Sequence, residues 1–589
     1  WDTHVGADTS GMPGSNCSYC CEAPPCPVHW GMGARGATGN VACDHYNIWR
    51  TDVALMKSMG LKAYRFSLSW PRLIPTGKLR DGVNDEGVAF YSELIDALLA
   101  AGVSPVVTLY HWDLPQALLD PPNEMAWWSV DEGGHPDAKI LEDWLDYVNL
   151  CFARFGDRVN TWVTFNEPWT FVFLGSGRGM APSIPETGNL TTDAWIAAHN
   201  LLIAHAEAVA LYRGKFRATQ KGSIGITNNM DWCEPASEDP ADTGASERCL
   251  LFALGWLADP IFGATGDYPP AMRALYGRRL PEFTLRQREL LRGSSDFFGL
   301  NHYGTSWIRN NLSNPGETLT YATGDAHGLP VAASSWLHGA GWGLRKLVNW
   351  VSRRYGNPPI IMTEGGWSAP ADVSASEASK DRMRTLYYAN YTSELRKAIF
   401  DDGVDVRGYF AWSLMDNFEW NAGYSVRFGT TYVDYSYGFD PNAAVNQQRQ
   451  PTAGRQWRRR KESSCWLEAV WRSQRLVDPG SDAFEGCVDS SVFQGTFVDS
   501  RIPGCAMTIE LDSSAGSANI TYSEVSGEGS CNGDGSVVAV DTAVVSGGTI
   551  VADVPRVGSR GLLQGFWRKV GSAIEWSDGG TWSQVDLVP

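Results

Sequence analysis

The sequence lacks the features that would direct it to a membrane or to nucleic acid. None of its 589 residues fall in an apolar run of 18 or more, so it predicts no membrane-spanning segment. Basic side chains are scarce: 48 Lys and Arg stand against 66 Asp and Glu, a net charge of −18 at pH 7. A chain this acidic repels phosphate backbones, so we expect no nucleic-acid partner. The one basic run, 458–461, is interpreted as an exposed helix face.

The cysteines lack the paired spacing of a metal site. Cys17, Cys20, Cys21 and Cys26 form C-x₂-C-C-x₄-C in a stretch rich in Gly and Pro. A zinc knuckle is the alternative interpretation, but its two ligand pairs are missing. We therefore predict disulfides that staple a loop, and no bound metal.

Several N-glycosylation sequons accompany the 12 cysteines. They lie at Asn16, Asn189, Asn311, Asn390 and Asn519. Disulfides and N-glycans form in oxidising compartments, so the sequence favours a disulfide-bonded glycoprotein that is secreted or held in the secretory pathway.

Tryptophan is abundant, at 26 residues. Indole rings stack on the C–H faces of sugars, and the indole N–H adds a polar contact. A tryptophan-rich core is the plainer explanation, so the composition only favours a carbohydrate ligand.

Short apolar runs alternate with amphipathic segments between residues 50 and 470. The runs are 61–70, 106–112, 162–168, 223–229, 296–303, 359–366 and 407–414. Helical spacing is clearest over 90–101, where Phe90, Leu94, Ile95 and Leu98 share one face and Gly102 follows. Apolar strands that alternate with helices predict an α/β fold with a parallel sheet. Seven strands are one short of a closed (β/α)₈ TIM barrel.

Polar and aromatic residues end these predicted strands. They are His111, Asn166, Glu167, Asn301, Tyr303, Glu364 and Trp412. In such a barrel the carboxyl ends of the strands carry the active site. Glycoside hydrolysis needs one carboxylic acid to protonate the leaving oxygen and one carboxylate to attack the sugar. Surface salt bridges would explain a lone Glu, but two at the ends of different strands predict a glycosidase.

Three motifs extend this prediction to a family. TFNEP at 164–168, TEGG at 363–366 and WSLMDNFEW at 412–420 occur in this order, with TLYHWDLPQAL before the first motif and GDYPPAMR between the first and the second. From about residue 40 to about 472 the chain resembles glycoside hydrolase family one, the β-glucosidase family. The resemblance implies a retaining exo-β-glycosidase, with β-glucosidase as the leading expectation and no cofactor.

The resemblance also assigns the catalytic residues. Glu167 matches the acid/base on the fourth strand, and Glu364 matches the nucleophile on the seventh. Arg65 and Tyr303 match the partners that keep the nucleophile ionised and aimed. Retention requires the two carboxyl groups to lie about 5–5.5 Å apart. At that distance we expect the charge of Glu364 to keep Glu167 protonated in the free enzyme.

The remaining matched residues would bind the substrate, a small-molecule or oligosaccharide β-glycoside. They are His111, Trp112, Asn166, Asn301, Tyr303, Trp336, Trp412, Glu419 and Trp420. Glu419 would bind the sugar 4- and 6-hydroxyls, which predicts an unphosphorylated sugar. The presence of the acid/base predicts an O-glycoside rather than a thioglucoside. Preference among gluco, galacto and fuco sugars stays open, as does the oligomeric state.

One family element is absent from the sequence. The family's first strand ends in Q-x-E-G, which occurs nowhere here, and the residues from Trp1 resemble the segment just after that strand. We therefore expect a barrel that lacks its first strand. The alternative function is a sugar-binding pseudoenzyme, or an inactive fragment, that lost turnover with this strand. Gly365 also departs from the usual Asn, a change that we expect the site to tolerate.

The sequence predicts two domains. Residues 1–475 would form the glycosidase barrel, with a Cys-rich insertion at 4–40 on its catalytic face. Residues 482–589 are rich in Gly, Ser, Val and Thr with alternating apolar positions, which predicts a small antiparallel β module of unknown function. Trp567, Trp576 and Trp582 would be core residues or, less simply, a polysaccharide-binding surface.

Overall fold

The structure is a computed structural model. It describes residues 39, 41–119, 126–131, 134–174, 190–311, 322–435 and 458–481, together with the backbone of eight strands between 495 and 584. The predicted insertion at 4–40, with its four cysteines, lies outside these residues except for Gly39.

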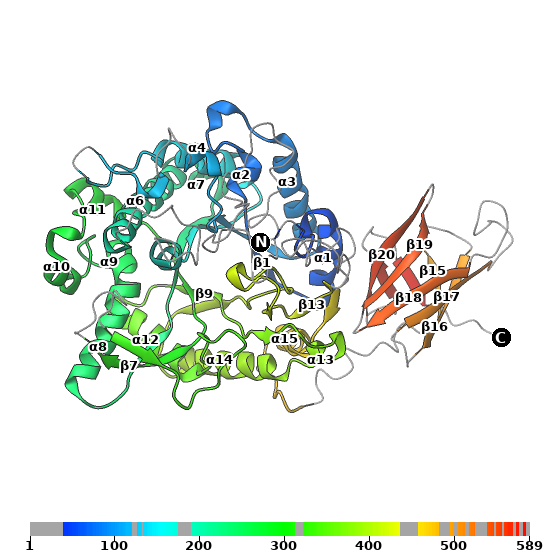
Figure 1. Ribbon diagram of the computed structural model, residues 1–589. Coiled ribbons are helices and arrows are strands. Elements are labelled where there is room, and N and C mark those ends of the chain that lie inside the picture. The colour runs from blue at the N-terminus through cyan, green and yellow to red at the C-terminus, as the bar shows by residue number, and fades with distance from the viewer. Residues whose placement is uncertain are drawn as a thin grey trace, which may run out of the picture.

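A curled parallel sheet forms the centre of the first domain (Figure 1). Its strands, in spatial order, are β1 (Ala63–Ser67), β2 (Ser104–Tyr110), β3 (Thr161–Asn166), β4 (Ser223–Asn229), β6 (Phe298–Asn301), β9 (Ile360–Glu364) and β11 (Val406–Tyr409). Each lies within or next to one of the seven predicted runs. The fold is therefore the predicted (β/α)₈ type, and the seven strands correspond to the family's second to eighth.

The two outer strands of this sheet, β1 and β11, do not pair with each other. Between them lies a cavity of about 570 Å³, lined by residues of both strands, including Tyr64, Phe66, Gly408 and Tyr409. The sheet thus stays open where the predicted first strand is missing, as far as the described residues show.

Amphipathic helices cover the outside of the sheet (Figure 1). The longer ones are α1 (His45–Met59), α3 (Asp85–Ala100), α4 (Leu141–Phe155), α6 (Leu190–Leu211), α8 (Pro240–Leu250), α12 (Gly341–Tyr355), α14 (Arg382–Phe400) and α15 (Glu462–Ser473). In α3 the four predicted residues, Phe90, Leu94, Ile95 and Leu98, are buried together. Residues 192–220 are long and apolar enough to cross a membrane, but 83% of the apolar window is buried inside the protein, as in a core helix.

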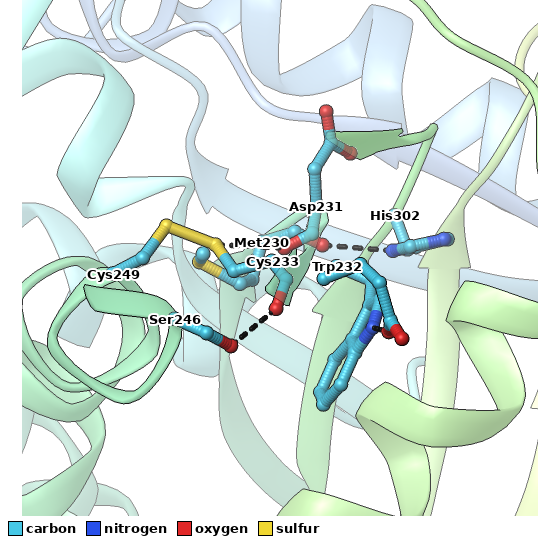
Figure 2. The surroundings of a disulfide bond; sticks show 8 residues. Met230, Asp231, Trp232, Cys233, Ser246, Cys249 and His302 are labelled. Atoms are coloured by element: carbon cyan, nitrogen blue, oxygen red, sulfur yellow. Dashed lines mark hydrogen bonds between the residues drawn. A yellow bond between two sulfur atoms is a disulfide. The ribbon is translucent and has the colours of Figure 1, made fainter. Parts of the chain in front are cut away.

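A smaller sheet stands beside the barrel, above the carboxyl end of β4. It consists of β5 (Trp232–Pro235), β7 (Thr305–Asn310) and β8 (Ala322–Asp325). A disulfide joins Cys233 of β5 to Cys249 of α8, and the Ser246 hydroxyl donates to the Cys233 carbonyl (Figure 2). This crosslink fixes the loop after β4 against the helix that follows it.

The interpretation of the basic run as an exposed helix face is wrong. Residues Arg458–Arg460 form a short strand, β14, that pairs with β13 (Thr431–Val433). Arg458 and Lys461 are almost fully buried. Arg458 pairs with Asp52, Arg460 with Glu468, and Lys461 with Asp416. Buried cations need such partners, and two of them, Asp52 and Asp416, lie far away in the sequence.

The C-terminal segment forms a closed antiparallel barrel of eight strands. They are β15 (Gly495–Asp499), β16 (Cys505–Asp512), β17 (Ser517–Glu524), β18 (Ala539–Ser546), β19 (Thr549–Arg556), β20 (Ser559–Arg568), β21 (Ala573–Trp576) and β22 (Thr581–Gln584). Trp567, Trp576 and Trp582 belong to its last three strands. Closure leaves no unpaired edge strand.

Candidate active site

Two buried carboxyl groups lie at the carboxyl ends of β3 and β9, which have two other strands between them in the sheet. Glu167 follows β3 directly, and Glu364 is the last residue of β9. Their exposed fractions are 8% and 4%. If the family's first strand is counted ahead of β1, β3 and β9 are the fourth and seventh strands, in agreement with the prediction.

Glu364 is held by two donors. Arg65 Nη1 lies 2.7 Å from its Oε1, and the Tyr303 hydroxyl donates to its Oε2 at 2.8 Å. Both side chains of the ion pair are 5% exposed, so water screens the attraction little. Burial, followed by the charge of Glu364, raises the pKa of Tyr303 well above its usual value, so the phenol stays a donor. These two contacts fix the orientation of the Glu364 carboxyl group.

Glu167 has a different environment. Its Oε1 accepts from Asn301 Nδ2 at 2.7 Å, and its Oε2 accepts from the Thr170 hydroxyl at 2.8 Å. Burial, with the charge of Glu364 as the second cause, raises the pKa of Glu167 to about 8. The sequence predicted this direction but named only the neighbouring charge. At neutral pH Glu167 therefore carries a proton.

One hydrogen-bond network joins the two carboxyl groups. Arg65 Nη2 donates to Asn166 Oδ1 at 2.5 Å, and Asn301 Nδ2 reaches the same oxygen at 3.2 Å. The Thr363 hydroxyl donates to Asn301 Oδ1 at 2.7 Å. Each amide is thereby oriented by a neighbour, which fixes the direction of its donor and acceptor atoms.

Aromatic rings gather on the other side of the site. His111 stacks on Trp412 and Trp420, with ring centroids 6.1 and 6.5 Å apart, and Trp112 stacks on Trp420 at 4.5 Å. His111 Nε2 lies 3.2 Å from Asn166 Nδ2. Burial, then the charge of Arg65, lowers the pKa of His111 well below its usual value. The ring is therefore neutral and can exchange hydrogen bonds with a sugar hydroxyl.

Glu419 is the third carboxyl group of the site. Burial, with the charges of Glu364 and Glu167, raises its pKa to about 8. Its Oε2 is buried and has no hydrogen-bond partner within the described part of the chain. A buried polar atom without a partner is costly, so this oxygen is suited to a ligand hydroxyl.

Trp336 lies at the rim of the site, with 51% of its surface exposed. Its ring meets Tyr303 edge-on at 5.6 Å and stacks over Phe428 at 6.5 Å. It is the one predicted site residue with a largely exposed side chain, which places it where the part of a substrate outside the sugar pocket would lie.

Three residues of the site have a strained backbone conformation. Trp112, Glu167 and Trp420 have φ values of 78°, 47° and 44°. Bulky residues seldom adopt this left-handed conformation, and such strain often accompanies function.

Three residues of the site were not predicted. Asn229 Nδ2 donates to the Thr170 hydroxyl at 2.8 Å, which orients Thr170 toward Glu167. Asp231 Oδ1 accepts from the backbone amides of Tyr303 and Gly304 at 3.1 and 2.8 Å (its position is seen in Figure 2). Thr170 and Asn229 therefore orient the acid, and Asp231 orients the tyrosine beside the nucleophile. Their positions at strand ends were the signal available in the sequence.

The local packing explains why position 365 is a glycine and not a larger residue. A Cβ atom added there would lie 2.7 Å from the Tyr409 hydroxyl and 3.1 Å from the His302 carbonyl oxygen. Tyr409 thus fills the space that a side chain at 365 would need. Among the residues described, no group of three or more His, Cys, Asp or Glu is arranged to hold a metal ion.

The comparison with known families decides the classification. Residues 29–475 match the family model described as glycosyl hydrolase family 1. The chain belongs to this family. It is therefore a glycoside hydrolase, and the retaining mechanism is general to family 1 enzymes.

Curated relatives and solved structures agree with this classification. The chain is 46% identical over 414 residues to β-glucosidase 1B of Phanerodontia chrysosporium, which covers 68% of the chain and 74% of the relative. It is 44% identical over 423 residues to β-glucosidase 12 of Oryza sativa subsp. indica, with 68% and 80% covered. A family 1 β-glucosidase from the fungus Humicola insolens, solved with glucose, matches with a TM-score of 0.67 at 38% identity, covering 75% of this chain and 90% of that one.

Proposed function

We propose that this family 1 enzyme hydrolyses unphosphorylated, O-linked β-glucosides by double displacement, with Glu364 as nucleophile and Glu167 as acid/base. One observation carries the assignment. Two buried carboxyl groups share one network, yet one is paired with Arg65 at 2.7 Å and the other has a pKa of about 8. Environments that separate two carboxyl groups in this way distinguish the nucleophile from the acid.

In the first step Glu364 attacks the anomeric carbon, and Glu167 gives its proton to the departing glycosidic oxygen. The aglycone leaves as an alcohol, and the sugar stays esterified to Glu364. Tyr303 and Arg65 must release part of their hold on the carboxylate as its charge moves into the new bond. Thr170 and Asn301 keep the acid aimed through this change.

The second step reverses these roles. Once Glu364 is esterified its charge is gone, so one of the causes that raise the pKa of Glu167 disappears. Glu167 then takes a proton from water, and the oxygen of that water attacks the anomeric carbon from the face that the aglycone left. The ester bond to Glu364 breaks as the new bond forms, so the sugar is released and Glu364 leaves as a carboxylate. Two inversions give net retention.

Three features support an unphosphorylated glucose unit. The partnerless Oε2 of Glu419 can accept from a 4- or 6-hydroxyl, and its neutral form can also donate. A 6-phosphate would add negative charge beside Glu419, Glu364 and Glu167. His111, Trp412 and Trp420 line the sugar pocket, and their flat rings can pack against a pyranose ring.

An assay of four aryl glycosides tests this substrate class. The β-glucoside, β-galactoside, β-fucoside and 6-phospho-β-glucoside are compared by kcat/KM under one set of conditions. We expect the glucoside to lead or to equal the best of the others, and the phosphorylated sugar to be nearly inert. Preference for the phosphorylated sugar would reject the role given to Glu419.

We also infer a secretory or extracellular location. The Cys233–Cys249 disulfide supports it, because such crosslinks persist in oxidising compartments. Release of N-glycans from the native protein by an endoglycosidase, read as a loss of mass, tests it. A native protein without glycans and with reduced cysteines would contradict the inference.

A further inference from the structure

The segment 412–420 carries three residues of the sugar pocket but no regular secondary structure. It runs from the end of β11 to the short helix η9 (Trp420–Ala422), with Trp412 at one end and Glu419 and Trp420 at the other. A backbone that lacks the regular hydrogen bonds of a helix or sheet depends on other contacts for its shape. The position of Glu419 is therefore set by whatever holds this segment.

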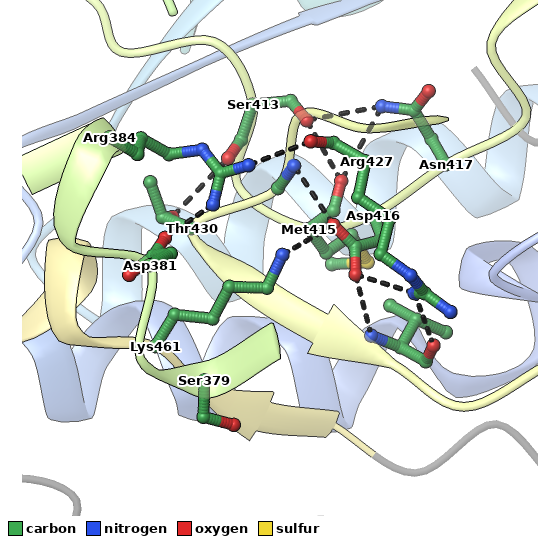
Figure 3. Close-up of polar contacts among 12 residues, drawn as sticks. Ser379, Asp381, Arg384, Ser413, Met415, Asp416, Asn417, Arg427, Thr430 and Lys461 are labelled. Carbon is green, nitrogen blue, oxygen red and sulfur yellow. Dashed lines mark hydrogen bonds and ion pairs between the residues drawn. The ribbon is translucent and has the colours of Figure 1, made fainter. Parts of the chain in front are cut away.

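Asp416, near the middle of the segment, has no exposed surface and accepts four hydrogen bonds (Figure 3). Its Oδ1 accepts from Lys461 Nζ at 2.7 Å and from the Gly429 amide at 3.0 Å. Its Oδ2 accepts from Arg427 Nη1 at 2.7 Å and from the Val433 amide at 3.3 Å. One carboxylate thus joins the segment to three other parts of the chain.

The partners of Asp416 are themselves fixed. Arg384 of α14 donates to the Arg427 carbonyl at 2.7 Å and pairs with Asp381 (Figure 3). Asp381 in turn accepts from the Ser463 amide at 2.8 Å, at the start of α15. The cluster therefore ties the pocket segment to two outer helices.

The backbone around Asp416 is closely packed and hydrogen-bonded. The Asp416 amide donates to the Thr431 carbonyl at 2.9 Å, and the Tyr435 hydroxyl donates to the Asp416 carbonyl at 2.6 Å. A Cβ atom at Gly429 would lie 2.0 Å from the Asp416 nitrogen. Loss of the carboxylate would leave buried cations without a partner, which the segment could relieve only by moving.

We propose that Asp416 is a positioning residue for specificity: through segment 412–420 it places Glu419 against the part of the sugar that carries the 6-hydroxyl. This rests on the proposed role of Glu419. Asp416 itself touches no substrate in this account. Its loss should therefore weaken recognition of the 6-hydroxyl more than it weakens the chemistry at Glu167 and Glu364.

The test compares an aryl β-glucoside with the matching β-xyloside, which lacks C6 and its hydroxyl. Asp416→Asn and Glu419→Ala, which removes the carboxyl group, are measured against the native enzyme at pH 6, where Lys461, whose pKa burial lowers to about 8, stays charged. We expect Asp416→Asn to lower kcat/KM for the glucoside tenfold or more and for the xyloside at most threefold, so that its glucoside-to-xyloside ratio approaches that of Glu419→Ala.

Two further variants make the comparison decisive. Asp259→Asn breaks a partly buried ion pair with Arg354, remote in sequence from the pocket segment, and should leave the ratio unchanged. Lys461→Met removes one partner of Asp416 and should lower the ratio in the same direction; it carries the test if Asp416→Asn does not fold.

The outcomes separate the inference from the function on which it rests. A collapsed ratio in Glu419→Ala with an unchanged ratio in Asp416→Asn and Lys461→Met would overturn the positioning role alone. An unchanged ratio in Glu419→Ala would overturn both this role and the one proposed for Glu419.

Discussion

The Thr170 hydroxyl donates a hydrogen bond of 2.8 Å to Oε2 of Glu167. This contact stabilises the ionised carboxylate and so lowers the pKa of Glu167, against the larger effect of burial, which raises it. The pKa of about 8 is the balance of these opposing effects. The Thr170 hydrogen bond thereby limits how far the pKa of Glu167 is raised.

Replacement of Thr170 by Val should raise the pKa of Glu167. Activity requires protonated Glu167 in the free enzyme, so the alkaline limb of kcat/KM should move to higher pH. A hydrogen bond to a charged group contributes about 1.5 kcal/mol, which corresponds to about one pH unit. Thr170→Ser, which keeps the hydroxyl, is the control. An alkaline limb that stays in place or moves down in Thr170→Val would exclude this role.

The barrel and most of the pocket could be predicted because their signals are local. Each strand is a continuous apolar run, and Glu167 and Glu364 sit at the ends of two such runs inside recognisable motifs. Burial of both faces of a parallel strand produces that pattern directly. Helix α3 was predicted for the same reason, since its apolar residues repeat with helical spacing.

The errors and omissions concern contacts between distant residues. Arg458 is buried because Asp52 lies beside it, and the two are 406 positions apart in the sequence. Lys461 and Asp416 are 45 apart. No local pattern distinguishes a cation that meets a distant carboxylate from one that faces water. The role of Asp231 could not be predicted for the same reason, because it depends on backbone amides of another loop.

Stability should depend on pH through Glu419. Its pKa is about 8 in the folded protein, above the usual value of 4.5, so folding favours the protonated form. The part of the folding free energy that depends on Glu419 is therefore fully present below about pH 4.5, and it is lost as the pH rises toward 8. Glu419→Gln removes this loss. At pH 9 the free energy of unfolding of Glu419→Gln should exceed that of the native enzyme by a few kcal/mol, and its Tm should be clearly higher. At pH 5 the two proteins should differ little.

Thermal unfolding of both proteins at the two pH values checks this prediction. Glu93→Gln, at a largely exposed carboxylate of helix α3, serves as control and should show no such difference. An equal change in Tm at pH 5 and pH 9 for Glu419→Gln would mean that Glu419 is not held in a raised-pKa environment.

The product should have retained configuration. Direct attack by Glu364 requires the carboxyl groups of Glu167 and Glu364 to lie about 5–5.5 Å apart, with no room for a water between them. Proton NMR during hydrolysis of an aryl β-glucoside should show the β anomer first, with the α anomer appearing later by mutarotation. Early appearance of the α anomer would indicate inversion and a wider separation.

The opening between β1 and β11 predicts a response to an added strand. Unpaired strand edges are unfavourable, and the 570 Å³ cavity lies between them. A strand ending in Q-x-E-G, joined ahead of Trp1, should raise both Tm and kcat/KM. The same extension with a proline in the middle of the strand is the control, since proline disrupts pairing. Equal activity with and without the added strand would show that the barrel is completed in another way.

Chemical rescue of Glu364→Gly tests the central claim most directly. The variant should lose hydrolysis of an activated aryl β-glucoside almost entirely, because no other group lies where the nucleophile stood. Added azide should occupy the vacated space, attack the anomeric carbon once, and restore turnover with an α-glucosyl azide as product. Near-native hydrolysis by Glu364→Gly without azide, or a β-configured azide product, would contradict the assignment of Glu364 as nucleophile.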